Sequence, residues 1–241
     1  MKTRRIVLIL CFGAVCASAQ LGGLLKKAPS SKTGTDTAAV MAQGQDLLAY
    51  VTIATDYGVE AVDAITSVFP PEKVQKIKDL AAKYNELKAK RGDQNIDAES
   101  VQVASQIAAE MAKLDSEWQI HLKEKSAAVR SADARLALVI LADGLAATKA
   151  PETAKAMQSA AQDLKSDPTQ VSKMNRLLSM AMVLATVGKE APQQVNSFRT
   201  VRGITKKIAE AEKIQLAADP SPDSVKDTTA LKMKVTSLSG S

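Results

Sequence analysis

The segment Glu72–Arg91, EKVQKIKDLAAKYNELKAKR, shows the clearest helical pattern in the chain. Its apolar residues recur every three or four positions, so they share one face of a helix. These residues are Val74, Ile77, Ala81, Tyr84 and Leu87. Acid-to-lysine pairs four positions apart repeat along the other faces, but each contributes only about 0.2–0.5 kcal/mol. The apolar stripe therefore decides the structure, and it needs a second apolar face to pack against.

The next segment supplies that face. After a turn at 92–95, Asp97 or Ser100 begins a long helix in which apolar residues keep close to a 3.5-residue spacing. They are Ala104, Ile107, Met111, Leu114, Trp118 and Leu122. This spacing is typical of helices that pack along their length. We therefore predict that Glu72–Arg91 and Ala98–Lys125 form an antiparallel, coiled-coil-like hairpin.

The rest of the chain also has helical periodicity, interrupted by glycine and proline. A first helix is expected over 36–57, with the helical pattern continuing over 59–68, and 128–147 either continues the Ala98–Lys125 helix or bends away from it near Ser126. Further helices are expected over 152–165, 168–188 and 192–217. The boundaries are placed at Gly58, Pro151, Gly188 and Pro192, because glycine commonly ends helices and proline removes a backbone donor. In 168–188 the apolar positions are taken as Val171, Met174, Leu178, Ala181 and Ala185. The chain is thus predicted to be an all-α antiparallel bundle of about six or seven helices, with almost no strand.

The C-terminal end is expected to differ from the bundle. Asp219-Pro-Ser-Pro-Asp marks a linker, and the residues after it are mostly polar. Leu231, Met233 and Val235 alternate with lysines, which is a weak strand signal. An isolated strand is not stable, so this segment would be either disordered or added to the sheet edge of a partner. Termini favour disorder.

Residues 1–19 have the organisation of a signal peptide. Basic residues near the start precede the apolar run Ile6–Ala17, and Ala17-Ser18-Ala19 offers small side chains to a signal peptidase. As a helix the run spans roughly 18 Å, which is too short for a hydrocarbon core of about 30 Å. Arg4-Arg5 also allows a twin-arginine signal, although the strongly apolar run favours general secretion. We expect an exported protein that begins at Gln20 or close to it.

These signals divide the chain into four parts: a signal peptide at 1–19, a flexible leader at 20–35, a helical-bundle domain at 36–218 and a disordered tail at 219–241. Cys11 and Cys16 both lie in the predicted signal, so the mature chain is expected to be free of cysteine. An exported domain without disulfides depends on its core alone.

Composition argues against several classes of partner. Without the predicted signal, 29 basic and 26 acidic residues remain, a net charge of +3 that is too small to indicate a nucleic-acid binder. Aromatic residues make up only 3% of the chain, and sugar clefts and single-strand platforms need such residues for stacking. We therefore expect no nucleic-acid partner.

His121 is the only histidine and the one candidate cofactor-binding residue. It shares a helix face with Glu117, Trp118 and Glu124, so one interpretation is a metal or haem ligand oriented by a carboxylate. The alternative is a helix-surface histidine beside a packed tryptophan. A di-metal bundle site needs a Glu-x-x-His from each of two helices, which one histidine does not provide. The prediction is therefore no metal site and no resident cofactor.

The sequence contains none of the common catalytic patterns. The predicted mature chain lacks cysteine and a Gly-x-Ser-x-Gly elbow, and its glycines make no phosphate-binding loop. Acidic residues are plentiful but fall on faces expected to be solvated. We predict that the protein is not an enzyme.

Three further segments allow a membrane or charged-surface interpretation. The apolar runs 134–147 and 177–187 are short for a membrane span, so buried bundle helices explain them better than conditional insertion does. Arg199, Arg202 and Lys206 form a small basic stripe that could contact anionic lipid or an acidic partner. A solvated face is the simpler interpretation of this stripe.

The leading functional hypothesis is an exported, non-enzymatic bundle that acts by protein–protein contact, in the periplasm or cell envelope or outside the cell. Its partner would be another protein or a second copy of the chain. The competing hypothesis is a small-ligand or haem carrier with an interhelical pocket near Leu177–Leu184. A conditionally membrane-inserting protein is a less favoured third.

Overall fold

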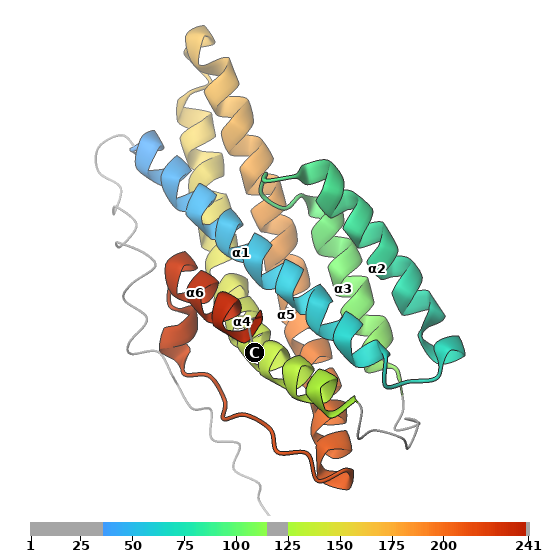
Figure 1. Ribbon diagram of the computed structural model, residues 1–241. Coiled ribbons are helices and arrows are strands. Elements are labelled where there is room, and N and C mark those ends of the chain that lie inside the picture. The colour runs from blue at the N-terminus through green and yellow to red at the C-terminus, as the bar shows by residue number, and fades with distance from the viewer. Residues whose placement is uncertain (1–35, 115–124, 240–241) are drawn as a thin grey trace, which may run out of the picture.

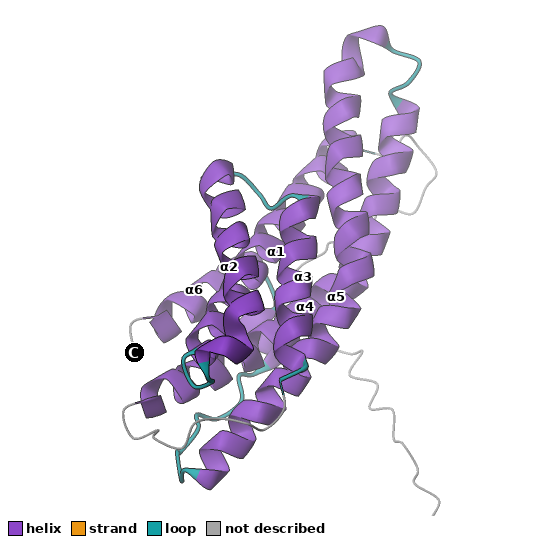
Figure 2. Cartoon of the chain, turned by 90° about the vertical axis from the view of Figure 1, so that its right-hand side faces the viewer, coloured by secondary structure: helices purple, strands orange, loops and turns teal. Residues whose placement is uncertain are grey.

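The computed structural model describes residues 36–114 and 125–239, and it is an all-α helical bundle as predicted (Figure 1). The helices are α1 (Thr37–Thr66), α2 (Pro71–Arg91), α3 (Ala98–Ala112), α4 (Ser126–Asp163), α5 (Val171–Ala211) and α6 (Thr228–Ser239). Two short 3-10 helices, η2 (Pro168–Gln170) and η3 (Pro222–Val225), precede α5 and α6. The described ranges contain no strand (Figure 2). The predicted signal peptide and leader lie outside them.

Helices α4 and α5 form the long antiparallel hairpin around which the other helices are arranged. They contain 38 and 41 residues, so they extend roughly 57 and 62 Å. Helix α1 packs mainly on α4, α3 packs on α5, and α2 packs on α3. Both views show that the end where α4 meets α5 projects beyond the other helices (Figures 1 and 2).

The predicted hairpin of α2 and α3 is confirmed within the described residues. Lys76 Nζ lies 2.9 Å from Glu110 Oε1, and Lys83 Nζ lies 2.8 Å from Glu99 Oε1, so the two helices run antiparallel. Asp97 caps α3 by accepting a hydrogen bond of 2.7 Å from the amide of Ser100. The part of this hairpin predicted beyond residue 114 lies in 115–124, outside the described residues.

Four predicted helix boundaries are wrong, because α1 continues through Gly58, α4 through Pro151, and α5 through Gly188 and Pro192. The two glycines mark places where helices approach closely. A Cβ added at Gly58 would lie 2.9 Å from Cζ of Phe198, and one added at Gly188 would lie 2.8 Å from Cγ of Pro151. Packing along α4 and α5 thus outweighs the lost backbone hydrogen bonds that make proline unfavourable inside a helix.

The buried side chains form two clusters along the bundle. One gathers residues from all six helices around Tyr84 and Phe198, and the other joins parts of α1, α3, α4 and α5 around Met157. The apolar runs 134–147 and 177–187 contribute many of these buried residues, as predicted for bundle helices. None of the helices in the described ranges is long and apolar enough to span a membrane.

The C-terminal segment differs from the disordered tail and the weak strand that were predicted. Residues 222–225 and 228–239 are helical and pack on α1 and α4. Leu231 is 1% exposed, and Val235 and Leu238 pack against the same core, whereas Met233 is 64% exposed. The buried residues follow a spacing of four and three, which is the helical period, and the prediction overlooked it in favour of an alternation of five residues.

Replacing Leu231 by alanine should lower the free energy of unfolding by about 2–4 kcal/mol, because a fully buried leucine leaves a cavity. Replacing the exposed Met233 by alanine is the matched control and should change it by less than about 0.5 kcal/mol. Urea unfolding followed by circular dichroism measures both. Equal, near-zero effects would mean that α6 does not dock on the bundle.

Replacing Gly58 by alanine should destabilise the protein by about 1–2 kcal/mol, because the new methyl group would press on the buried side chains of Phe198 and Val139. Gly144 also lies inside a helix, but a Cβ there would meet nothing within 4 Å. Gly144→Ala should therefore stabilise the protein by about 0.5–1 kcal/mol. Thermal unfolding of both variants gives the comparison, and a stabilising Gly58→Ala would contradict this packing.

Candidate functional site

The residues predicted around a cofactor lie outside the described part of the chain. His121, Glu117, Trp118 and Glu124 all fall in 115–124. Within 36–114 and 125–239, no group of three or more histidine, cysteine or acidic side chains is placed to hold a metal ion.

The predicted basic stripe on α5 is divided by an ion pair. Arg199 and Lys206 are exposed, but Arg202 turns inward and binds the buried Asp133 of α4, with both N–O distances at 3.2 Å. Arg202 also pairs with Asp219 in the linker after α5. Its guanidinium therefore joins α4, α5 and the linker. The stripe is not a continuous basic surface.

A second charged cluster joins α1 to α2. Asp56 accepts a hydrogen bond of 2.6 Å from the hydroxyl of Tyr84, and Arg91 Nη2 lies 2.8 Å from each carboxylate oxygen of Asp56. Burial, together with the negative charge of Asp56, raises the pKa of Tyr84 above its ordinary value, so the phenol stays neutral. The three side chains pair with one another and so connect the two helices, while Nε and Nη1 of Arg91 are buried without a hydrogen-bond partner.

Asp143 is the most unusual titratable residue in the described chain. It lies in α4, is 3% exposed, and its Oδ2 has no hydrogen-bond partner. Burial raises its pKa to about 7. Its charge also raises the pKa of Tyr50, although burial contributes more, and the Tyr50 hydroxyl donates a hydrogen bond of 2.9 Å to the carbonyl of Val225. The carboxyl is thus part of the core where the C-terminal segment docks.

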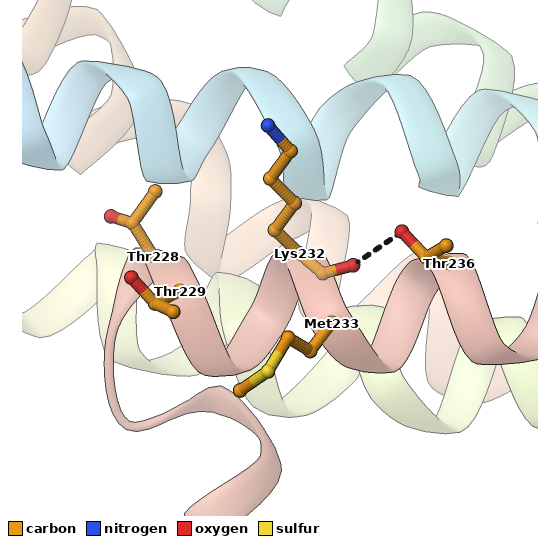
Figure 3. Close-up of a pocket in the computed structure, with 5 residues that line it drawn as sticks. All are labelled: Thr228, Thr229, Lys232, Met233 and Thr236. Atoms are coloured by element: carbon orange, nitrogen blue, oxygen red, sulfur yellow. Dashed lines mark hydrogen bonds between the residues drawn. The ribbon is translucent and has the colours of Figure 1, made fainter.

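A surface hollow of about 410 Å³ lies along α6 (Figure 3). Its lining residues are Thr228, Thr229, Lys232, Met233 and Thr236. All of them come from one helix, and the close-up shows two of them joined only by a hydrogen bond along that helix. The lining includes threonine hydroxyls and one lysine but no histidine or acidic side chain to activate them. The interhelical pocket expected near Leu177–Leu184 falls instead in a packed region, where both leucines are fully buried beside Met157.

A row of exposed apolar side chains lies along the N-terminal part of α5. Val171 is 48% exposed, Leu178 is 39% exposed and Met182 is 69% exposed. Their spacing of seven and four residues places them on one face of α5, over roughly 16 Å. We call these three residues the α5 apolar row. They are three of the four large apolar side chains that are exposed in the described chain, the fourth being Met233.

The sequence prediction missed this row because it assigned Val171 and Leu178 to the core. Of the predicted positions, Ala181 is buried as expected, and the core face of α5 also includes Leu177 and Leu184. Apolar residues occur on two faces of this segment, so periodicity alone does not decide which face is buried. This segment contains more apolar residues than one helix face can hold. That excess was the sequence signal that could have revealed an exposed apolar row.

Comparison with protein-family models, curated proteins and solved structures finds no match to this chain. The surface chemistry of the described residues is therefore the basis for the function proposed below.

Replacing Asp143 by asparagine should remove a pH dependence of stability. An unfolded aspartate titrates near pH 4, so between about pH 4 and pH 7 the folded chain binds the proton more strongly. Stability should then fall as pH rises through this window, by up to about 1.4 kcal/mol per pH unit, and level off above pH 7.

Urea unfolding at pH 5 and pH 8 measures the effect of this substitution. Asp143→Asn should be more stable than the parent at pH 8 and have a flatter pH profile. Asp163→Asn, at an exposed position of the same helix, should keep the profile of the parent. Parallel profiles for the parent and Asp143→Asn would show that this carboxyl does not titrate in the core.

Proposed function

We propose that this protein is exported and acts without catalysis, by contact with another protein in the periplasm, in the cell envelope or outside the cell. The observation that carries the proposal is the α5 apolar row. Export is supported by the signal-peptide pattern at 1–19.

The arrangement of the row, more than its size, supports a contact surface. Single exposed apolar residues are common on soluble proteins and need no explanation. Here three of them share one helix face within the first twelve residues of α5. A ridge in that position is accessible to a partner without any rearrangement of the bundle.

The structure gives less support to the other hypotheses. A carrier needs space between helices, and the region near Leu177–Leu184 is filled by side chains from α4 and α5. Self-association through the α2–α3 hairpin is also less favoured, because the apolar faces of these two helices pack against the rest of the same chain.

A photo-crosslinking amino acid at position 182, introduced in the native host, tests the proposal. We expect one dominant protein adduct from this position. The same amino acid at the exposed Asn85 of α2 is the control and should give no such adduct. Mass spectrometry of the adduct identifies the partner and the first residue of the chain.

The same measurement separates the two parts of the proposal. An adduct whose chain begins near Gln20 supports both contact and export, whereas a chain that retains 1–19 opposes export. No protein adduct from position 182, or equal adducts from both positions, would remove the support for a specific contact through α5.

A further inference from the structure

We propose that the C-terminal segment, residues 222–239, is a pH-sensitive part of the bundle. It docks on α1 and α4 while the buried carboxyl of Asp143 is neutral, and ionisation of this carboxyl releases it. Such a device would operate whether or not α5 binds another protein, so it goes beyond the proposed function.

The C-terminal segment is a small element that depends on docking for its structure. It follows the irregular stretch 214–221 and consists of η3, with four residues, and α6, with twelve (Figure 1). Val225 and Leu231 are buried in the core, and Val235 and Leu238 pack against it. Isolated helices shorter than about 12–15 residues are marginal in water. Release from α1 and α4 would therefore also loosen the helix itself.

Tyr50 of α1 holds the start of this segment. Its side chain is fully buried, and its hydroxyl donates a hydrogen bond of 2.9 Å to the carbonyl of Val225 in η3. Four residues earlier in α1, the carbonyl of Asp46 accepts a hydrogen bond of 3.2 Å from the hydroxyl of Thr228. Polar contacts thus fix the first part of the segment, and apolar packing holds the rest of α6.

Asp143 of α4 lies beside this polar contact. It is almost fully buried, and its Oδ2 has no hydrogen-bond partner. Its charge acts on Tyr50, so the carboxyl and the phenol are close together. An ionised carboxylate without a partner is very unfavourable in an apolar interior. Undocking removes the cover that Val225 gives to the hydroxyl of Tyr50, and we expect water then to reach the carboxyl and stabilise its charged form.

The other titratable groups around the contact do not produce the same effect. Burial alone raises the pKa of Asp143, and no charged side chain of the described residues contributes to that shift. Burial and the charges of Asp143 and Asp227 raise the pKa of Tyr50, so the phenol stays neutral. The carboxylate of Asp227 accepts a hydrogen bond of 2.7 Å from an amide at the start of α6, where negative charge stabilises a helix. Ionisation of Asp227 would therefore strengthen docking. Asp223 and Lys226 are exposed.

The direction of the pH effect follows from the form that binds the proton more strongly. Burial raises the pKa of Asp143 to about 7 in the docked form, whereas a carboxyl open to water titrates near pH 4. Docking should therefore weaken as pH rises from about 4 to about 7 and level off above pH 7. Between pH 5 and pH 8 the population of the released form should rise about tenfold or more.

Hydrogen exchange of the full chain at pH 5 and pH 8, followed by mass spectrometry, tests this proposal. Protection factors, which are corrected for the intrinsic effect of pH on exchange, report local opening. In peptides from 228–239 we expect protection to fall about tenfold or more between pH 5 and pH 8. Peptides from α3 are the internal control, because the described residues show no contact between α3 and α6. Their protection should change much less.

Substitutions identify the group that is responsible. Asp143→Asn keeps the size of the side chain but does not ionise, so it should remove the pH dependence of protection in 228–239. Asp163→Asn, at an exposed position of the same helix, should keep the dependence of the parent. Tyr50→Phe removes the hydrogen bond to Val225 and should lower protection of α6 at both pH values. Circular dichroism shows whether each variant is folded.

Three results would overturn the proposal. Equal protection of 228–239 at pH 5 and pH 8 in the parent excludes a pH-sensitive contact, and this result needs no variant. A dependence on pH that persists in Asp143→Asn assigns the effect to another group. A parallel loss of protection in α3 and α6 shows that ionisation destabilises the whole bundle and does not release one segment.

Discussion

The close packing of α4 against α5 is the constraint on which the rest of the molecule depends. Both helices are longer than any other helix of the bundle, and they hold together through small residues and rings at close approach, as where Gly188 lies against Pro151. The pair Asp133–Arg202 fixes the two helices at a second position. Helices α1 and α3 then cover part of this hairpin, and its remaining length projects.

Two largely buried ion pairs connect helices of the bundle. The described residues contain no cysteine, so no disulfide fixes the arrangement. Asp133 with Arg202 and Asp56 with Arg91 each join two helices, and such buried pairs lose much of their attraction to the cost of desolvation. They are costly to break, however, because one charge would be left buried without its partner. Asp143 avoids this cost differently, since a pKa near 7 allows it to be buried as the neutral acid.

The helical bundle could be predicted from the sequence where one apolar face dominates, as in α2, whose stripe of Val74, Ile77 and Ala81 is buried. The prediction failed where tertiary contacts outweigh local preference. Gly58 does not end a helix, because Phe198 needs the space that its missing side chain leaves. The segment that forms α6 is short, and its apolar residues fit both the two-residue period of a strand and the period of a helix. Only packing against α1 and α4 could therefore decide between strand and helix. The α5 apolar row was missed for a related reason. The apolar residues of α5 occupy more than one face, and which face is buried depends on the helices that pack against that part of α5.

The α5 apolar row differs in exposure from the core residues of the same helix. Core residues on this stretch of α5, such as Leu177 and Leu184, are fully buried in the cluster around Met157. Val171, Leu178 and Met182 instead keep 39–69% of their surface exposed. Exposed apolar residues lower solubility and increase the tendency to aggregate, so a helix in water gains nothing from three of them on one face. The proposed contact with another protein would remove this apolar surface from water.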